Sequence, residues 1–377
     1  MPVAALLVVC ATAVCACVAA YLCIAVIAVR ERSAVPAQWP GEWPSISVLK
    51  PLYGVEAATY DCLRSFCVQD YPEFELLFGV QDEADPARDI VQRLVREFPG
   101  RRIRMVVDQR QHGGNRKVGN LINLLAMAGH EHLVIADSDI LVPPHYLQTV
   151  VAPLADPGVG VVTCAYRGLP RPGLPSLLGA LFVNDWFLPS VRVAALLGSR
   201  RFAFGATIAL RREALVAIGG FEAIADQLAD DYQLGELTRR RGLRTVLSSL
   251  EVETVVEERS WRDLLRHELR WLRTIRAVRP AGYALSAVTF GVPVALLATL
   301  AAAGASPALA CTGIAVMARL VLHWRVRGRA VPPWAWLVLP LGDTLSLALW
   351  CWGFATHDVH WRDDRYLLTG DGAAQRY

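Results

Sequence analysis

The stretch Leu133-Val134-Ile135-Ala136-Asp137-Ser138-Asp139 decides the fold. Its apolar half predicts a buried β-strand, and its two aspartates follow at the carboxyl end of that strand. In an open α/β sheet, ligands bind outside the carboxyl ends of the strands. Carboxylates suit hard divalent cations, which usually also take oxygens from substrate phosphates. The stretch therefore predicts a Mg or Mn site held by Asp137 and Asp139, although an isolated D-x-D fits a solvated turn equally well.

The surrounding segments alternate between strand and helix patterns. Apolar runs predict strands at residues 45–49, 74–80, 103–107 and 133–136, and the segments between them predict helices at 57–69, 86–98 and 117–128. This alternation favours right-handed βαβ units and a parallel sheet, so the fold class is α/β. Beyond the D-x-D stretch, strands are expected at 159–166, 206–210 and 244–247, with a helical region at 177–197. We interpret the chain as a nucleotide-binding half followed by an acceptor-binding half.

The apolar residues are concentrated at the two ends of the chain. Of 377 residues 54% are hydrophobic, and the mean hydropathy is +0.33. Residues 3–29 carry no charge and are long enough to cross a bilayer as a helix. A cleaved signal peptide fits less well, because no basic residue precedes the apolar stretch. Arg30 and Arg32 follow it and predict a cytoplasmic location for this end.

The C-terminal part predicts further membrane spans. Residues 283–324 read as two spans with a turn at 304–307, and residues 334–355 read as a third. Arg325, Arg327 and Arg329 mark the cytoplasmic side between them. Four spans in all would place the tail on the opposite side from the middle domain, unless one segment is re-entrant. The expected organisation is a membrane helix at 1–30, a linker at 31–44, a soluble domain at 45–280 with an interfacial helix at 258–279, membrane helices at 281–356 and a tail at 357–377.

Other polar residues follow the predicted strands or begin the predicted helices. Asp82 follows the second strand and is a candidate for binding a base or ribose, or else a helix cap. Lys50 ends the first strand, where it either meets a nucleotide or simply terminates the strand. Asn115 and Lys117 lie in a Gly-rich helix start that favours an anionic ligand, although a surface turn is the plain alternative.

Acidic and basic residues in the second half are candidates for catalysis. Asp230 and Asp231 begin a helix, where they either cap the first turn or supply a general base. Arg270 and Trp271 belong to a helical stripe of arginines spaced three or four residues apart, which is typical of a helix lying on anionic lipid. A fixed cation beside an aromatic ring would also stabilise a leaving diphosphate. The stripe comprises arginines at 259, 262, 266, 270, 273, 276 and 279.

Taken together, these residues resemble a membrane-bound inverting glycosyltransferase of GT-A fold, the ceramide glucosyltransferase-like family 21. The family pattern is a first Asp, a D-x-D-like site, an acidic pair that ends in the base, and (Q/R)-x-x-R-W. Here it reads Asp82, Asp137-Ser138-Asp139, Asp230-Asp231 and His267-x-x-Arg270-Trp271, in the same order. His267 departs from the usual Gln or Arg. The resemblance spans residues 45–279 and also includes Lys50, Asn115 and Lys117; the flanking spans and Trp361-Arg362 agree with it.

The resemblance implies specific roles. Asp231 would be the base, assisted by Arg270 and Trp271, while Lys50, Asp82, Asn115, Lys117, Asp137, Asp139 and His267 would bind the UDP-sugar. The match looks closest to the bacterial hopanoid-biosynthesis branch, which implies transfer of N-acetylglucosamine from UDP-GlcNAc to bacteriohopanetetrol at the inner membrane. A ceramide glucosyltransferase and a processive polysaccharide synthase are the alternatives within this chemistry, and a membrane transporter or nucleotide-binding scaffold is the non-enzyme alternative. The net charge of +3 indicates no particular partner, and no nucleic acid is expected.

Overall fold

A computed structural model describes residues 3–30, 38–199, 202–356, 358–361, 364–368 and 374–376. The middle of the chain forms an eight-stranded mixed sheet in the order β3-β2-β1-β4-β7-β6-β8-β5. Strands β3, β2, β1 and β4 run parallel to one another, whereas β7 is antiparallel to both of its neighbours, β4 and β6. The strands are β1 (Ile46–Pro51), β2 (Phe74–Val80), β3 (Arg102–Val107), β4 (His132–Ile135), β5 (Ile140–Leu141), β6 (Val159–Pro170), β7 (Ile208–Arg211) and β8 (Arg244–Val256).

Helices cover both faces of this sheet. Because alternate side chains of a strand point to opposite faces, Val48 packs in one hydrophobic cluster and Leu49 in the other, and Leu76 and Leu77 divide in the same way. Burial on both faces explains why β1 and β2 read as nearly continuous apolar runs. The helices of this domain are α2 (Thr59–Cys67), α3 (Ala87–Glu97), α4 (Arg116–Leu125), α5 (Tyr146–Val151), α8 (Arg212–Ala217) and α9 (Asp230–Arg240).

The strands and helices predicted in the first half are confirmed to within three residues at each end. The greatest difference is β8, which extends to Val256 although only residues 244–247 were predicted as a strand. Ser248 and Glu251 interrupt its apolar pattern, and its parallel pairing with β6 contains two register shifts. Such irregular pairing displaces side chains from strict alternation, which removes the period-two signal.

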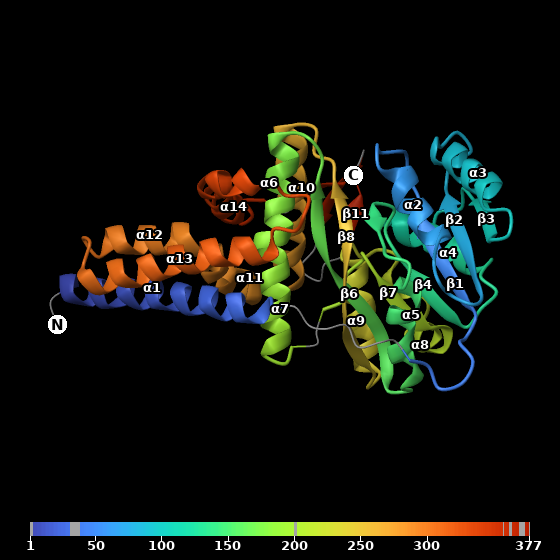
Figure 1. The fold of residues 1–377 in the computed structure, drawn as a ribbon, viewed down its shortest axis with the longest axis horizontal. Coiled ribbons are helices and arrows are strands. Elements are labelled where there is room, and N and C mark those ends of the chain that lie inside the picture. Colours follow the sequence, from blue (N-terminus) through green and yellow to red (C-terminus); the bar gives the residue numbers. More distant parts are fainter. Residues whose placement is uncertain are drawn as a thin grey trace.

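Within the described residues, five helical segments are long and apolar enough to cross a membrane, including one near the N-terminus. Three of them, α1 (Val3–Ala28), α12 (Gly291–Ala301) and α13 (Ser306–Val326), pack side by side as a bundle that points away from the sheet (Figure 1). The short α11 (Pro280–Leu285) precedes α12 and belongs to the same apolar segment. The N-terminus lies at the far end of this bundle.

The segment Leu174–Leu196 is apolar but does not run with the bundle. It consists of α6 (Leu174–Leu181), a π-helical turn (Phe182–Phe187) and α7 (Leu188–Leu196), which together form one rod. Figure 1 shows this rod lying across the ends of the bundle helices, between them and the sheet. The long α10 (Trp261–Val278), which corresponds to the helix predicted at 258–279, lies behind the rod.

The C-terminal strands return to the α/β domain, which bears on the number of spans. A small sheet of β9 (Asp358–Trp361), β10 (Asp364–Leu368) and β11 (Ala374–Arg376) follows α14 (Leu339–Trp352). Val359 and Tyr366 are buried against Leu228 of the α/β domain, and Arg273 of α10 donates to the Asp358 carbonyl at 2.5 Å.

This contact bears on the two alternatives that the sequence left open, four complete spans or one re-entrant segment. If α1, α12 and α13 each cross the membrane, a crossing by α14 would carry the tail to the side opposite the α/β domain. The packing of the tail on that domain therefore favours the re-entrant alternative for α14. In Figure 1, α14 is seen nearly along its own axis, out of line with the bundle, as a re-entrant segment would be.

Candidate active site

A cleft of about 1200 Å³ opens at the carboxyl ends of β1, β2 and β4. One wall comes from the sheet and its loops, and the other comes from α10 and the rod that borders the membrane bundle. The loop after β2 contributes Asp82, whose Oδ1 accepts the backbone N–H of Ala84 at 2.9 Å. The strand-end location predicted from the sequence is therefore where this cavity lies.

Lys117 joins the D-x-D stretch to the acidic pair. Its Nζ lies 2.8 Å from Asp137 and 3.1 Å from Asp230, although these carboxylates come from different halves of the chain. Burial alone would lower the pKa of Lys117, but the charges of Asp137 and Asp230 outweigh burial and raise it. A permanently charged ammonium at this point holds the two halves of the cleft together.

Asp139 is the second carboxylate of the D-x-D stretch and is held by Thr254. Its Oδ2 accepts the Thr254 hydroxyl at 2.6 Å, and its pKa is raised by burial and then by the charge of Asp137. A buried carboxylate whose ionisation is disfavoured by a neighbouring carboxylate is suited to bind a divalent cation. No set of three His, Cys, Asp or Glu side chains around a metal position exists among the described residues, so a cation held here would take further oxygens from a ligand.

Asp231 is held in a different way from its neighbour Asp230. Its Oδ2 accepts the backbone N–H of Gly205 at 2.8 Å, and its Oδ1 accepts that of Tyr232 at 2.7 Å. Burial and the adjacent charge of Asp230 raise the pKa of Asp231 to about 6. A carboxylate with a pKa near neutrality is suited to accept a proton during a reaction.

The opposite wall carries the three α10 residues of the predicted motif. His267, Arg270 and Trp271 all line the cleft. The Trp271 ring packs against Tyr166 and Phe187, with centroids 6.0 and 5.8 Å away. These aromatic contacts hold the guanidinium-bearing turn of α10 against the cleft.

Comparison with known proteins now identifies the family. A sequence model described as glycosyl transferase family 21 matches residues 7–374. The chain belongs to this family. The prediction made from the four motifs is therefore confirmed at the level of the family.

Two curated relatives illustrate the range of this similarity. Ceramide glucosyltransferase 1 of Caenorhabditis elegans is 27% identical over 207 residues, covering 55% of this chain and 44% of the relative. An N-acetylglucosaminyltransferase of Mesorhizobium japonicum is 26% identical over 242 residues, covering 62% of this chain and 56% of the relative. The chain thus spans about half the length of these curated relatives.

Among solved structures, the mannosyltransferase PcManGT of Pyrobaculum calidifontis, in complex with GDP-Man and Mn2+, superposes with a TM-score of 0.53. The two chains are 21% identical, and the match covers 92% of this chain and 94% of the other. Likeness at this identity shows the fold alone, and it confirms the GT-A class predicted for this family 21 protein.

Two of the predicted ligand residues, Lys50 and Asn115, lie beneath the cleft and do not line it. The Lys50 ammonium is fully buried, donates to the Asp137 carbonyl at 2.5 Å and lies over the Phe66 ring. The Asn115 side chain caps α4 by accepting the N–H groups of Lys117 and Val118. In the family 21 protein both residues therefore support the loops that carry Asp137 and Lys117, and the structure shows no direct route from them to a ligand.

The arginine stripe also differs from the prediction of a lipid-facing row. Arg273 donates to the Asp358 carbonyl, and Arg276 donates to those of Phe354 and Thr356 at 2.8 and 2.9 Å. Arg266 and Arg279 line the cleft. Because the spacing of three to four residues drifts around a long helix, the stripe is divided between the cleft, the tail and the solvent.

Sequence reasoning missed three residues that shape the site. Thr254 comes from the second half of β8, which was not predicted as a strand, and Glu258 comes from the loop that follows β8. Gly205 approaches so closely that an added Cβ would lie 2.9 Å from Asp137 Oδ2 and 3.0 Å from Lys117 Nζ. The glycine in Phe204-Gly205-Ala206-Thr207 was the available signal, because a glycine between apolar residues often marks a close approach of the backbone.

Proposed function

We propose that this protein transfers N-acetylglucosamine from UDP-GlcNAc to a hydroxyl of a membrane lipid, bacteriohopanetetrol, with inversion at the anomeric carbon. The observation that carries the proposal is the meeting of Asp137, Asp139 and Asp231 in one cleft whose far wall borders the apolar bundle. A water-soluble acceptor would make no favourable apolar contact with that wall. A lipid could remain in the bilayer while its hydroxyl enters the cleft.

The geometry suits direct displacement. Asp231 takes the proton of the acceptor hydroxyl as its oxygen bonds to the anomeric carbon, and the bond from that carbon to the diphosphate breaks. Negative charge then grows on the departing diphosphate, where the Arg270 guanidinium stabilises it more than in the ground state. Asp137 and Asp139 would hold a Mg or Mn ion, which when bound neutralises diphosphate charge. A single displacement converts an α-linked donor into a β-linked product, and NMR of the product's anomeric proton tests this.

The choice of sugar and lipid rests on the family branch and on the rhizobial relative named as an N-acetylglucosaminyltransferase. The test is expression in a bacterium that makes hopanoids, followed by thin-layer and mass analysis of total lipids. A new C35 hopanoid carrying the mass of an N-acetylhexosamine is the expected result. A strain expressing the Asp231→Asn variant serves as the control, since it contains the protein without its proposed base.

A ceramide glucosyltransferase is the second candidate, and the similarity to Ceramide glucosyltransferase 1 favours it. Assays that offer UDP-glucose with ceramide beside UDP-GlcNAc with bacteriohopanetetrol distinguish the two. Faster transfer in the first pair would replace the hopanoid assignment and leave the mechanism unchanged.

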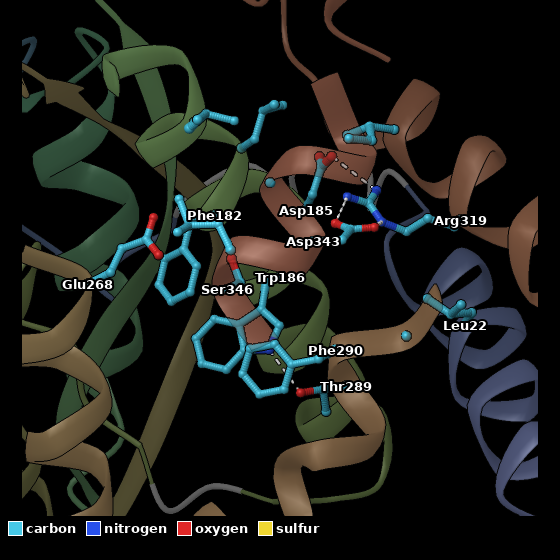
Figure 2. Close-up of a pocket in the computed structure, with 16 residues that line it drawn as sticks. Leu22, Phe182, Asp185, Trp186, Glu268, Thr289, Phe290, Arg319, Asp343 and Ser346 are labelled. Atoms are coloured by element: carbon cyan, nitrogen blue, oxygen red, sulfur yellow. Dashed lines mark hydrogen bonds and ion pairs between the residues drawn. The ribbon is translucent and has the colours of Figure 1, made fainter. Parts of the chain in front are cut away.

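A transporter or scaffold is the non-enzyme candidate. Charged residues inside apolar helices often mark a transport path, but here Arg319 pairs with Asp185 at 3.0 Å and with Asp343 at 2.8 Å (Figure 2). These ion pairs connect α13, the rod and α14, so the charges stabilise the packing of these helices. UDP release that requires a lipid acceptor would exclude the non-enzyme candidate.

The location we propose is the bacterial inner membrane, with the α/β domain in the cytoplasm. The α13 helix ends next to the basic residues Arg325 and Arg327, at the end of the bundle nearer the domain. Arg325 also donates to the Val26 carbonyl of α1 at 2.7 Å, so both helices end at one level. Basic residues at that level favour the cytoplasmic side.

A further inference from the structure

The side chains of α10 that line the cleft change from charged to mostly apolar along the helix. Residues three and four apart share a helix face, and those that line the cleft are charged in the first half of α10 and mostly apolar in the second. Arg266 and His267 precede Arg270, whereas Ile275 and Val278 follow it. From Arg270 to Val278 the helix rises about 12 Å. The cleft lining is therefore charged up to Arg270 and mainly apolar over Ile275 and Val278, and Arg279 lies where α10 ends.

The rod supplies the facing apolar wall. Trp186, Phe187, Ser190, Val191 and Ala194 line the cleft and follow helical spacing along one side of the rod. Ser190 also hydrogen-bonds to the Tyr21 hydroxyl of α1 at 3.0 Å. Because α1 is the most apolar candidate span, this contact brings the apolar part of the cleft next to the membrane bundle.

The wall is closed behind Trp186. Its ring is stacked between Phe182 and Phe290, with centroids 4.6 and 5.3 Å away, and its Nε1 donates to the Thr289 hydroxyl (Figure 2). The pocket on the far side of this stack has only about 30 Å³ of free space. That is room for a water or two, so an apolar ligand cannot pass through the bundle at this point.

We propose that the groove between α7 and the second half of α10, lined by Ser190, Val191, Ala194, Ile275 and Val278, binds the apolar body of the lipid acceptor. The occupant is an amphiphile whose hydroxyl-bearing end reaches the charged half of the cleft while its apolar body stays beside α1. It enters along the rod, because the Trp186 stack blocks the way through the bundle. The inference rests on the proposed transfer to a lipid and adds where that lipid lies.

The experiment introduces a charge into the groove. Ile275 is 39% exposed, so the Ile275→Glu variant should fold, and Leu196→Glu is the matched control because Leu196 is an exposed residue of the same rod outside the cleft lining. Steady-state kinetics are measured with bacteriohopanetetrol in detergent. Loss of one apolar contact and burial of a charge should raise the KM for the lipid at least about tenfold. The KM for UDP-GlcNAc should stay within about twofold, since the donor phosphates bind in the charged part.

Two outcomes overturn the inference: an unchanged lipid KM in Ile275→Glu, or an equal rise in Leu196→Glu. If the wild-type protein transfers sugar to no lipid, the proposed function fails, and the groove is tested by labelling instead. A long-chain diol bearing a diazirine is photolysed with the full-length protein, and the labelled peptides are mapped by mass spectrometry. Labelling of the peptides containing Ala194 and Ile275, reduced by Ile275→Glu, would support the groove. Labelling confined to other helices would overturn it.

Discussion

The Nδ1 atom of His267 lies 2.6 Å from Oε1 of Glu258, so a buried carboxylate accepts a hydrogen bond from an imidazole that lines the cleft. The Glu258 side chain is 7% exposed and that of His267 is 36% exposed. His267 makes no hydrogen bond through Nε2 within the described ranges, and Nδ1 is committed to Glu258. The hydrogen bond thereby orients His267, the one residue of the family motif that departs from Gln or Arg.

Glu258→Ala should weaken donor binding, because the variant loses the acceptor that orients His267 towards the cleft. We expect the KM for UDP-GlcNAc to rise by about two- to tenfold, which corresponds to the loss of one hydrogen bond. Glu257→Ala is the control, because Glu257 binds the N–H groups of Ala57 and Ala58 instead. Steady-state kinetics measure the effect, and an equal KM in all three proteins would show that the contact between Glu258 and His267 does not affect donor binding.

Asp139→Ala should abolish turnover and metal-dependent UDP binding. The pKa of Asp139 is raised by burial and by Asp137, so removing its charge should leave the metal-free protein as stable as before or more so. Thr254→Val, which removes the hydroxyl that orients Asp139, should weaken activity less severely. Turnover, calorimetric binding of UDP with Mg or Mn and thermal unfolding are the measurements. Substantial activity of Asp139→Ala without added metal would refute the assignment.

Asp231→Asn should reduce kcat by several orders of magnitude, on the order of 10³-fold or more. UDP-GlcNAc affinity should remain close to normal, because the side chain is bonded to the N–H groups of Gly205 and Tyr232. The base must be deprotonated and its pKa is about 6, so wild-type activity should fall as the pH drops through that value. Weak donor binding with a modest loss of rate would instead make Asp231 a donor-binding residue.

Glu268→Gln should make the protein more stable at alkaline pH. Burial and then the charge of Glu258 raise the pKa of Glu268 to about 8, from an ordinary value of 4.5. Between these values the folded protein keeps a proton that the unfolded chain releases. The wild type therefore loses stability as the pH rises from 4.5 towards 8, on the order of 1 kcal/mol per pH unit. The free energy of unfolding of both proteins is measured in detergent at pH 5, 7 and 9. The difference between Glu268→Gln and the wild type should increase with pH, and a difference that does not change with pH would contradict the prediction.

Arg270→Ala should lower kcat more than donor affinity, since its charge is needed most as the diphosphate departs. Two other arginines of α10 serve as comparisons. Exposed Arg262 should affect mainly membrane association, which flotation with anionic liposomes measures. Arg273→Ala should loosen the C-terminal sheet, detectable as faster proteolysis, because Arg273 binds the Asp358 carbonyl. One common defect in all three variants, rescued equally by anionic lipid, would remove the special role of Arg270.

Much of the fold could be predicted because local patterns coincide with the tertiary environment. The β2 strand is buried on both faces, so its apolar run was recognisable at the same residues, Phe74–Val80. The second half of β8 gave no such signal, since a register shift against β6 separates it from the first half and its polar residue Thr254 lines the cleft. Trp361 lies in β9, but its side chain and Arg362 fall outside what the structure describes, so their agreement with the family stays a prediction.

The sequence by itself determined which residue types are present in which order: the D-x-D stretch, the acidic pair, the Arg-Trp motif and the apolar ends. Order along a chain carries no distances, so only the tertiary structure decided that Lys117 bridges Asp137 and Asp230, and that Lys50 and Asn115 are turned inward. Hydropathy likewise measures the length of an apolar segment and carries no information about the orientation of the resulting helix. That the rod lies across the bundle and that the C-terminal sheet packs on the α/β domain follow from contacts between residues far apart in sequence, such as Leu228 with Tyr366.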